Sequence, residues 1–179
     1  MDFQHLDTTQ FQQRMKPAAA RIYESVFHGC VIRDLRGKEK DAHILDKEFA
    51  VDMLLYLSCG QWLSIQEKYR RHDAMKFMDF TQEYMNADGT VYESPGEWFK
   101  LGAQLYFYGW ANEEETEFEK WVILDIPKYK WFVEFSGGLD ALGQKRFNAK
   151  HGKASFYAIP IMRLEPVFFT DYRKHSGQQ

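Results

Sequence analysis

Three polar side chains, Asp52, Gln66 and Lys68, have the types and the spacing needed to bind a divalent metal ion and a phosphate. Carboxylate and amide oxygens coordinate hard cations, and a lysine ammonium can hold a phosphate as a point charge. Gln66 and Lys68 are two residues apart, so on a β-strand they share one face, whereas Glu67 points to the opposite face. These groups can act together only if the chain brings Asp52 beside the other two.

The residues around these side chains predict a β-hairpin that places Asp52 in this way. Residues 50–57 are apolar and of strand length, residues 58–61 are typical of a tight turn, and residues 62–71 begin as a second strand. Asp52 lies near the start of the first strand. Asp46 is six residues earlier and is expected to stabilise the beginning of that strand, since it could share a metal with Asp52 only if the backbone bends between them.

The rest of the chain predicts an alternation of helices and strands. The sequence predicts a first helix that ends near Pro17 and a second helix from Pro17 to about residue 27. Residues 33–42 are dense in charge and predict an exposed loop. Further strands are predicted at residues 75–85, 121–126 and 154–162, and further helices at residues 98–108 and 127–135. This order is typical of an α/β sandwich with a mixed sheet.

Size and composition predict one well-packed domain over residues 1–179. The chain has 179 residues, of which 17% are aromatic, and a formal charge of −3 that gives no global attraction to nucleic acid. Cys30 and Cys59 lack metal-ligand spacing, which favours a reduced, intracellular (cytoplasmic) protein. The sequence shows neither the pattern of a secretory signal nor an apolar segment of membrane-spanning length, so we expect no membrane partner.

The combination of Asp52 with Gln66-Glu67-Lys68 resembles the PD-(D/E)XK nuclease superfamily, whose fold is shared by many restriction enzymes, junction resolvases and repair nucleases. Two positions depart from the pattern, because Val51 stands in place of the proline and Gln66 in place of the acid. Some members of the superfamily carry glutamine at that position. The resemblance covers roughly residues 17–126 and implies a restriction-endonuclease-like three-layer sandwich, with a mixed central sheet flanked by helices.

The same resemblance implies a metal-dependent deoxyribonuclease that uses Mg²⁺ or Mn²⁺ and acts on DNA, as a homodimer in many enzymes of this class. Asp52 and Glu24, an acid on the preceding helix, would supply negative charge to the metal site, and the Gln66 side-chain oxygen and the Glu67 backbone carbonyl would complete the protein ligands. Lys68 would orient the attacking water or stabilise the charge on the phosphate. Without the resemblance, Glu24 is an ordinary solvated helix residue.

Basic residues in two segments are candidates for contacts with DNA phosphates. Arg70 and Arg71 directly follow the hairpin motif, and a second basic segment carries no acid of its own, which predicts a positive local potential. Its candidate residues are Lys145, Arg146, Asn148, Lys150 and Lys153. Arg70 and Arg71 are equally consistent with solvated charges at the end of a strand. The second segment is also consistent with a solvated loop, but its charge has the same sign as that of Arg70 and Arg71, which favours a nucleic-acid contact.

Other functions are consistent with the same residues. Asp52 can cap a neighbouring loop, and Lys68 can be an exposed lysine on an edge strand. The uncharged Gln66 favours a nucleic-acid- or protein-binding module that keeps the fold with a weakened site. A structural or assembly protein, with the aromatic segment 98–110 as an interface, is a third possibility.

Overall fold

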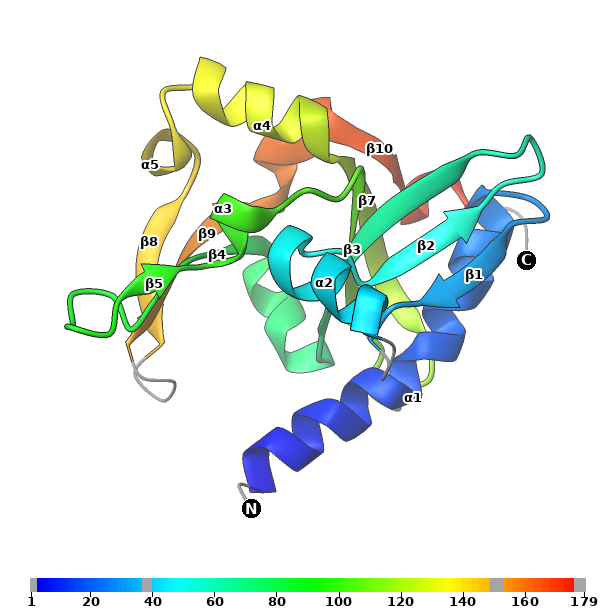
Figure 1. The fold of residues 1–179 in the computed structure, drawn as a ribbon, viewed down its shortest axis with the longest axis horizontal. Coiled ribbons are helices and arrows are strands. Elements are labelled where there is room, and N and C mark those ends of the chain that lie inside the picture. The colour runs from blue at the N-terminus through cyan, green and yellow to red at the C-terminus, as the bar shows by residue number, and fades with distance from the viewer. Residues whose placement is uncertain (1–2, 37–39, 149–152, 176–179) are drawn as a thin grey trace.

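Two β-sheets and five α-helices form the described part of the chain, which comprises residues 3–36, 40–148 and 153–175 of a computed structural model (Figure 1). The first sheet has six strands in the order β1-β2-β3-β6-β7-β10. Their bounds are β1 Val31–Asp34, β2 Met53–Tyr56, β3 Trp62–Arg70, β6 Leu105–Ala111, β7 Phe118–Asp125 and β10 Phe168–Asp171. This sheet is mixed, because β3 and β6 are parallel whereas the other neighbouring pairs are antiparallel.

A second, antiparallel sheet has four strands in the order β5-β4-β9-β8. Their bounds are β4 Asp79–Asn86, β5 Ser94–Pro95, β8 Gln144–Asn148 and β9 Ala154–Pro160. The helices are α1 Phe3–Val26, α2 Lys40–Phe49, α3 Glu97–Lys100, α4 Ile126–Phe135 and α5 Leu139–Leu142, with 3-10 helices η1 His72–Phe77, η2 Ile161–Val167 and η3 Tyr172–Lys174. The α/β class and the mixed sheet are therefore confirmed.

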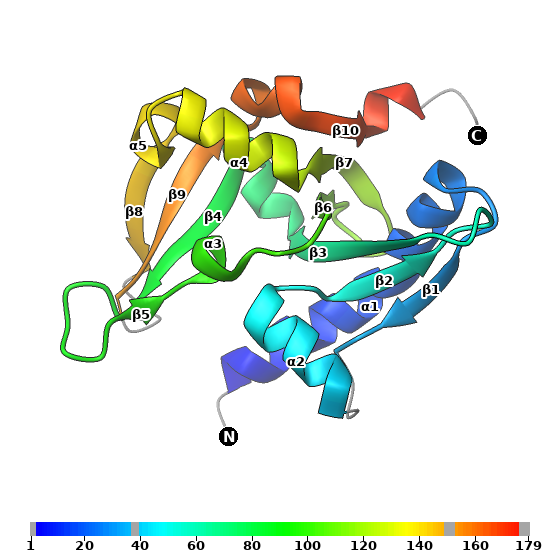
Figure 2. The ribbon, with the colours of Figure 1, turned by 45° about the horizontal axis from the view of Figure 1, so that its top comes forward.

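Each face of the six-stranded sheet has its own hydrophobic core. On one face, α1 packs through Phe11, Met15 and Tyr23 against alternate residues of the strands, such as Ile65 and Phe107. On the other face, residues of β6 and β7 pack against the second sheet and α4. Figure 2 shows α1 along one face, with the four-stranded sheet at the opposite end of the molecule from β1 and β2. The layer opposite α1 is thus largely a sheet, where flanking helices were expected.

The predicted helix over residues 98–108 is wrong. Only α3 is helical there, and β6 follows at Leu105–Ala111. All seven residues of β6 are buried, so the strand lacks the alternation of apolar and polar residues that marks a half-buried strand. The apolar residues of this segment happen to have the spacing of one helix face, which is why the sequence predicts a helix. In the structure the segment is a central strand, a position in which aromatic and β-branched residues pack well.

Three smaller differences concern the N-terminal half. Pro17 lies inside α1 without dividing it, because the flanking buried residues Met15, Ala18 and Ala19 pack that helix against the sheet. The charged residues 33–42 contribute to β1 and α2 instead of forming only a loop. Residues 72–77 form η1, and only the second part of the predicted strand 75–85 is extended, as β4.

Candidate functional site

The predicted hairpin is present and brings Asp52 beside Gln66. Strands β2 and β3 are antiparallel, with Met53 opposite Ile65. Asp52 directly precedes the paired segment, and its backbone N–H donates to the Ile65 carbonyl at 2.9 Å. Gln66 and Lys68 alternate with Ile65, which packs against α1, so they occupy the other face of β3, and Asp52 lines the same cleft as these two residues.

The Asp52 carboxylate is held against the backbone of β3. Its Oδ2 accepts a hydrogen bond of 2.8 Å from the Glu67 N–H, and the residue is only 7% exposed. Burial raises the pKa of Asp52 to about 7, although the Arg36 guanidinium and the Glu67 N–H act in the opposite direction. The N–H and carbonyl of one strand residue lie on the same edge of the strand, so the Glu67 carbonyl is directed to the same side as Asp52.

Asp52, Gln66 and Lys68 line one open cleft of about 460 Å³ between the two sheets. Glu83 of β4 and Glu97 of α3 lie on its opposite wall. Other residues that line it come from α1, α2, α3 and the segments that follow β1 and precede β2, and they include Thr8, Gln12, Arg36, Asp46, Ala50 and Lys100. The hairpin therefore forms one wall of a polar cleft, and the second sheet supplies much of the other.

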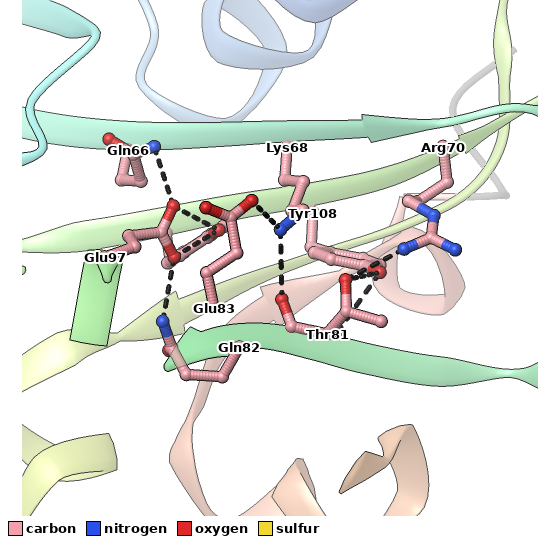
Figure 3. Close-up of polar contacts among 9 residues, drawn as sticks. Gln66, Lys68, Arg70, Thr81, Gln82, Glu83, Glu97 and Tyr108 are labelled. Atoms are coloured by element: carbon pink, nitrogen blue, oxygen red, sulfur yellow. Dashed lines mark hydrogen bonds and ion pairs between the residues drawn. The ribbon is translucent and has the colours of Figure 1, made fainter. Parts of the chain in front are cut away.

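Glu97 is a buried carboxylate that links Gln66 to the second sheet (Figure 3). Its Oε2 accepts from Gln66 Nε2 at 3.1 Å, and its Oε1 accepts from Gln82 Nε2 at 2.8 Å and from the Tyr106 hydroxyl at 2.9 Å. Burial raises the pKa of Glu97, and the charge of Lys68 opposes this shift. Figure 3 shows the Gln66 carbonyl oxygen turned away from Glu97.

Lys68 crosses the gap between the sheets (Figure 3). Its Nζ forms an ion pair of 2.8 Å with Glu83 Oε1 and donates to the Thr81 carbonyl at 3.3 Å. Burial alone would lower the pKa of Lys68, but the carboxylates of Glu83 and Glu97 outweigh it and the pKa is raised. Lys68 is therefore a cation at neutral pH.

The Glu67 side chain points to the opposite face, as predicted, into a polar cluster beneath α1 that includes Arg36 and adjoins the cleft. Its side chain is 1% exposed and forms an ion pair of 2.7 Å with Arg36 Nη2, while its Oε1 accepts from the Tyr23 hydroxyl. Arg36 also donates to Asp34 Oδ1 at 3.0 Å. The Glu67 side chain thus anchors β3 on the face that packs against α1, and only the Glu67 backbone is directed toward Asp52.

The structure does not bring Glu24 to the cleft. Glu24 is exposed on α1, whose neighbouring residue Tyr23 is the one that faces the sheet. Asp46, which was expected only to stabilise the start of the strand, lines the cleft instead. Asp46 reaches the cleft because the backbone bends between Asp46 and Asp52. Helix α2 ends at Phe49, and Ala50 has a φ of 47°.

The basic residues proposed for DNA contacts are largely paired with acids. Arg71 forms ion pairs with Asp7 and Glu115, and Arg70 donates to the Thr81 hydroxyl at 2.8 Å. The segment expected to lack neighbouring acids receives them from β4 and the loop after it. Lys145 pairs with Asp88 at 2.7 Å, and Arg146 lies 3.9 Å from Asp79.

The remaining residues of that basic segment differ in position. Asn148 lines a second groove, which it shares with Lys68, Arg70 and Glu83, so this groove continues from the cleft. Lys153 is exposed just before β9. Lys150 lies outside the described residues. Of the six predicted contact residues that the structure describes, Arg70 and Asn148 line a groove together with Lys68.

A metal ion would need oxygen ligands of mixed type here. Within residues 3–36, 40–148 and 153–175, no three Asp, Glu, His or Cys side chains gather closely enough to hold a metal. The Asp52 carboxylate, the Gln66 amide oxygen and the Glu67 carbonyl are nevertheless suitable for Mg²⁺, which is often bound through one or two carboxylates and keeps several waters. Gln66 Oε1 is buried and has no hydrogen-bond partner among the described residues, as expected of a ligand atom.

Sequence reasoning missed Glu97, Glu83 and Arg36. In the sequence, Glu97 directly precedes the predicted helix over residues 98–108, and Arg36 lies in the charged segment 33–42 that predicts an exposed loop. Their roles depend on contacts with residues 31 positions away in the chain, as for Glu97 and Gln66. Of these three residues, only Glu97 has a sequence context that indicates burial, because it stands next to aromatic residues.

Neither protein-family models, nor the sequences of curated proteins, nor solved structures match this chain. In the part of the chain that the structure describes, no helix has the length and apolar character required to cross a membrane.

Proposed function

We propose that this chain is a metal-dependent deoxyribonuclease of the PD-(D/E)XK type, with a restriction-endonuclease-like core. One observation carries the proposal: Gln66 and Lys68 share one face of β3, Asp52 directly precedes the antiparallel neighbour β2, and all three line a common cleft. A long helix, α1, precedes these strands, and β3 continues the sheet through a parallel partner, β6. Both features agree with what the sequence resemblance implies.

Asp52, the Gln66 side-chain oxygen and the Glu67 carbonyl would hold Mg²⁺ or Mn²⁺. A bound divalent ion would polarise the phosphate and lower the pKa of a water molecule. The role of Lys68 follows from its ion pair with Glu83, because an ammonium group donates hydrogen bonds and cannot accept a proton from water. Of the two roles expected for Lys68, we therefore assign it the stabilisation of negative charge on the phosphate, for which it must exchange Glu83 for the substrate.

The path of the DNA strand is proposed from the continuity of the two grooves. Lys68 lies where they meet, and Arg70 and Asn148 line the second groove. A strand with its scissile phosphate at Lys68 would extend along Arg70. Action as a homodimer and a cytoplasmic location remain predictions from the sequence.

Replacing Lys68 by methionine should lower the rate of DNA nicking by roughly 100- to 1,000-fold, the range found when one transition-state donor is removed. The measurement is conversion of supercoiled plasmid to nicked circles in Mn²⁺, with EDTA as the metal-free reference. Lys128→Met is the matched control, because Lys128 forms an exposed ion pair with Asp125 on α4 and should leave the rate unchanged. Wild-type rates in the Lys68→Met protein would contradict the assignment.

A second candidate is a binding module of the same fold. It is favoured by the internal ion pair of Lys68 with Glu83 and by the hydrogen bond of Gln66 to Glu97, which satisfy both side chains without any ligand. Such a module should bind DNA in EDTA, with an affinity that falls steeply with salt. DNA binding without cleavage in any divalent metal would favour it over the nuclease.

A further inference from the structure

We infer that Glu97 is a positioning residue that supplies the negative charge missing at position 66 and turns the Gln66 carbonyl oxygen toward the metal position. This inference rests on the proposed function. The motif departs most from the expected chemistry at position 66, where glutamine replaces an acid.

The fold fixes Glu97 tightly against the second sheet. The preceding residue, Gly96, donates from its N–H to the Tyr84 carbonyl at 2.7 Å. A Cβ atom at Gly96 would lie 2.6 Å from that oxygen, so only glycine allows this close approach. Glu97 is the first residue of α3 and is 7% exposed. Its side chain therefore has one position, between the sheets.

The groups around Glu97 determine the orientation of the Gln66 amide. Gln66 Nε2 and Gln82 Nε2 both donate to Glu97, one to each oxygen, and the Tyr106 hydroxyl bonds to both oxygens. An ionised carboxylate only accepts hydrogen bonds. The opposite orientation of the Gln66 amide would place its carbonyl oxygen against a carboxylate oxygen, which is repulsive. Glu97 thus selects the orientation in which Oε1 points away from it (Figure 3).

The selected orientation leaves an acceptor with no partner. Gln66 Oε1 is buried and lacks a hydrogen bond within the described residues. Asp52 directly precedes β2, the antiparallel neighbour of β3, and lines the same cleft as Gln66, so a cation held between the two side chains would be bound by a carboxylate and an amide oxygen. Donation of Nε2 to a carboxylate also polarises the amide and increases the negative charge on Oε1. Gln66 and Glu97 together then act in place of the single acid of the motif.

A charge-exchange experiment tests this inference. Glu97→Gln removes the negative charge. The double variant Gln66→Glu with Glu97→Gln exchanges the two groups, so that position 66 carries the carboxylate and position 97 carries the amide that donates to it. The readout is the affinity for Mn²⁺ alone, measured by calorimetry on the complete chain, with cleavage as a second readout. We expect Glu97→Gln to weaken Mn²⁺ binding by roughly 10- to 100-fold. The double variant should recover to within about threefold of the wild type.

The control is Tyr106→Phe, which removes a donor to Glu97 from β6 without touching Gln66. It disturbs the same buried network, so a purely structural role of Glu97 predicts similar losses of Mn²⁺ affinity in Tyr106→Phe and Glu97→Gln. We expect Tyr106→Phe to bind Mn²⁺ like the wild type. Thermal unfolding of each variant identifies any that fail to fold, and the double variant remains informative if Glu97→Gln is unfolded.

The outcomes separate this inference from the proposed function. A wild-type protein that binds Mn²⁺ and nicks DNA, together with a Glu97→Gln variant of unchanged affinity, overturns the role of Glu97 alone. A double variant no tighter than a folded Glu97→Gln also overturns it. A wild-type protein that neither binds Mn²⁺ nor nicks DNA overturns both the inference and the proposed function.

Discussion

Asp52→Asn is expected to remove DNA cleavage and also to stabilise the metal-free protein at pH 8. Asparagine has the same size as aspartate, and its side-chain oxygen can still accept the hydrogen bond from the Glu67 N–H. What it lacks is the charge that a metal ion requires and that burial disfavours in the absence of metal. Loss of activity with a gain of stability distinguishes a functional carboxylate from a structural one.

The pH dependence of this gain follows from the pKa of Asp52. Burial raises it from 3.8 to about 7, so the folded state binds the Asp52 proton more tightly than the unfolded state does. The charged carboxylate therefore destabilises the wild type progressively as the pH rises from about 4 to about 7, and by a constant amount above that range. At pH 8 the asparagine variant should be more stable by about 2–4 kcal/mol, and the difference should shrink toward pH 5.

Urea unfolding with EDTA at pH 5 and pH 8 measures this effect. Asp73→Asn is the control, because Asp73 is exposed on η1, and its free energy of unfolding should change by less than about 0.5 kcal/mol at either pH. A wild type more stable than Asp52→Asn at pH 8 would show that Asp52 stabilises the fold through its charge. In that case the electrostatic attraction of the Asp52 carboxylate to the Arg36 guanidinium would outweigh the cost of its burial.

Arg36→Ala should have the largest effect on stability, a loss of about 3–5 kcal/mol in the free energy of unfolding. Arg36 is the cation that pairs with Glu67 Oε2, and the Glu67 side chain is 1% exposed. Removing the guanidinium leaves a buried carboxylate with the Tyr23 hydroxyl as its remaining hydrogen-bond donor among the contacts described. An unpaired buried charge is far more costly than the loss of a surface ion pair.

The matched comparison is Arg21→Ala, which removes an exposed ion pair between Arg21 and Glu117 and should cost less than about 1 kcal/mol. Adding Glu67→Gln to Arg36→Ala removes the stranded charge and should recover most of the loss. Equal, small losses for Arg36→Ala and Arg21→Ala would mean that water or a rearranged side chain reaches Glu67. The double variant would then give no recovery.

Local patterns predicted the hairpin and much of the α/β order. The turn at residues 58–61, the shared face of Gln66 and Lys68, and the opposite direction of Glu67 all follow from short-range chemistry and the period of a strand. Helix α4 is also predicted locally, by Pro127 near its start and the glycines after its end. These features depend on residues within a few positions of one another.

Features that depend on distant contacts could not be predicted. Strand β4 pairs with β9, which begins about 70 residues later, and this pairing creates the second sheet and the far wall of the cleft. Lys145 seemed free because its partner, Asp88, belongs to another loop. Glu24 was expected as a ligand because the sequence gives the order of the helix but not its place in space, and in the structure α1 turns Tyr23 toward the sheet and leaves Glu24 exposed.

The most direct test of the proposed metal site is the rate of supercoiled-plasmid nicking by the wild type and by Asp52→Asn, measured together over a range of Mn²⁺ concentrations at constant ionic strength. We predict a wild-type rate that rises with Mn²⁺ and saturates, and a folded Asp52→Asn variant whose rate stays at the level seen in EDTA. Nicking by both proteins at the same rate, or by neither at any Mn²⁺ concentration, would contradict a nuclease site built on Asp52, Gln66 and Lys68.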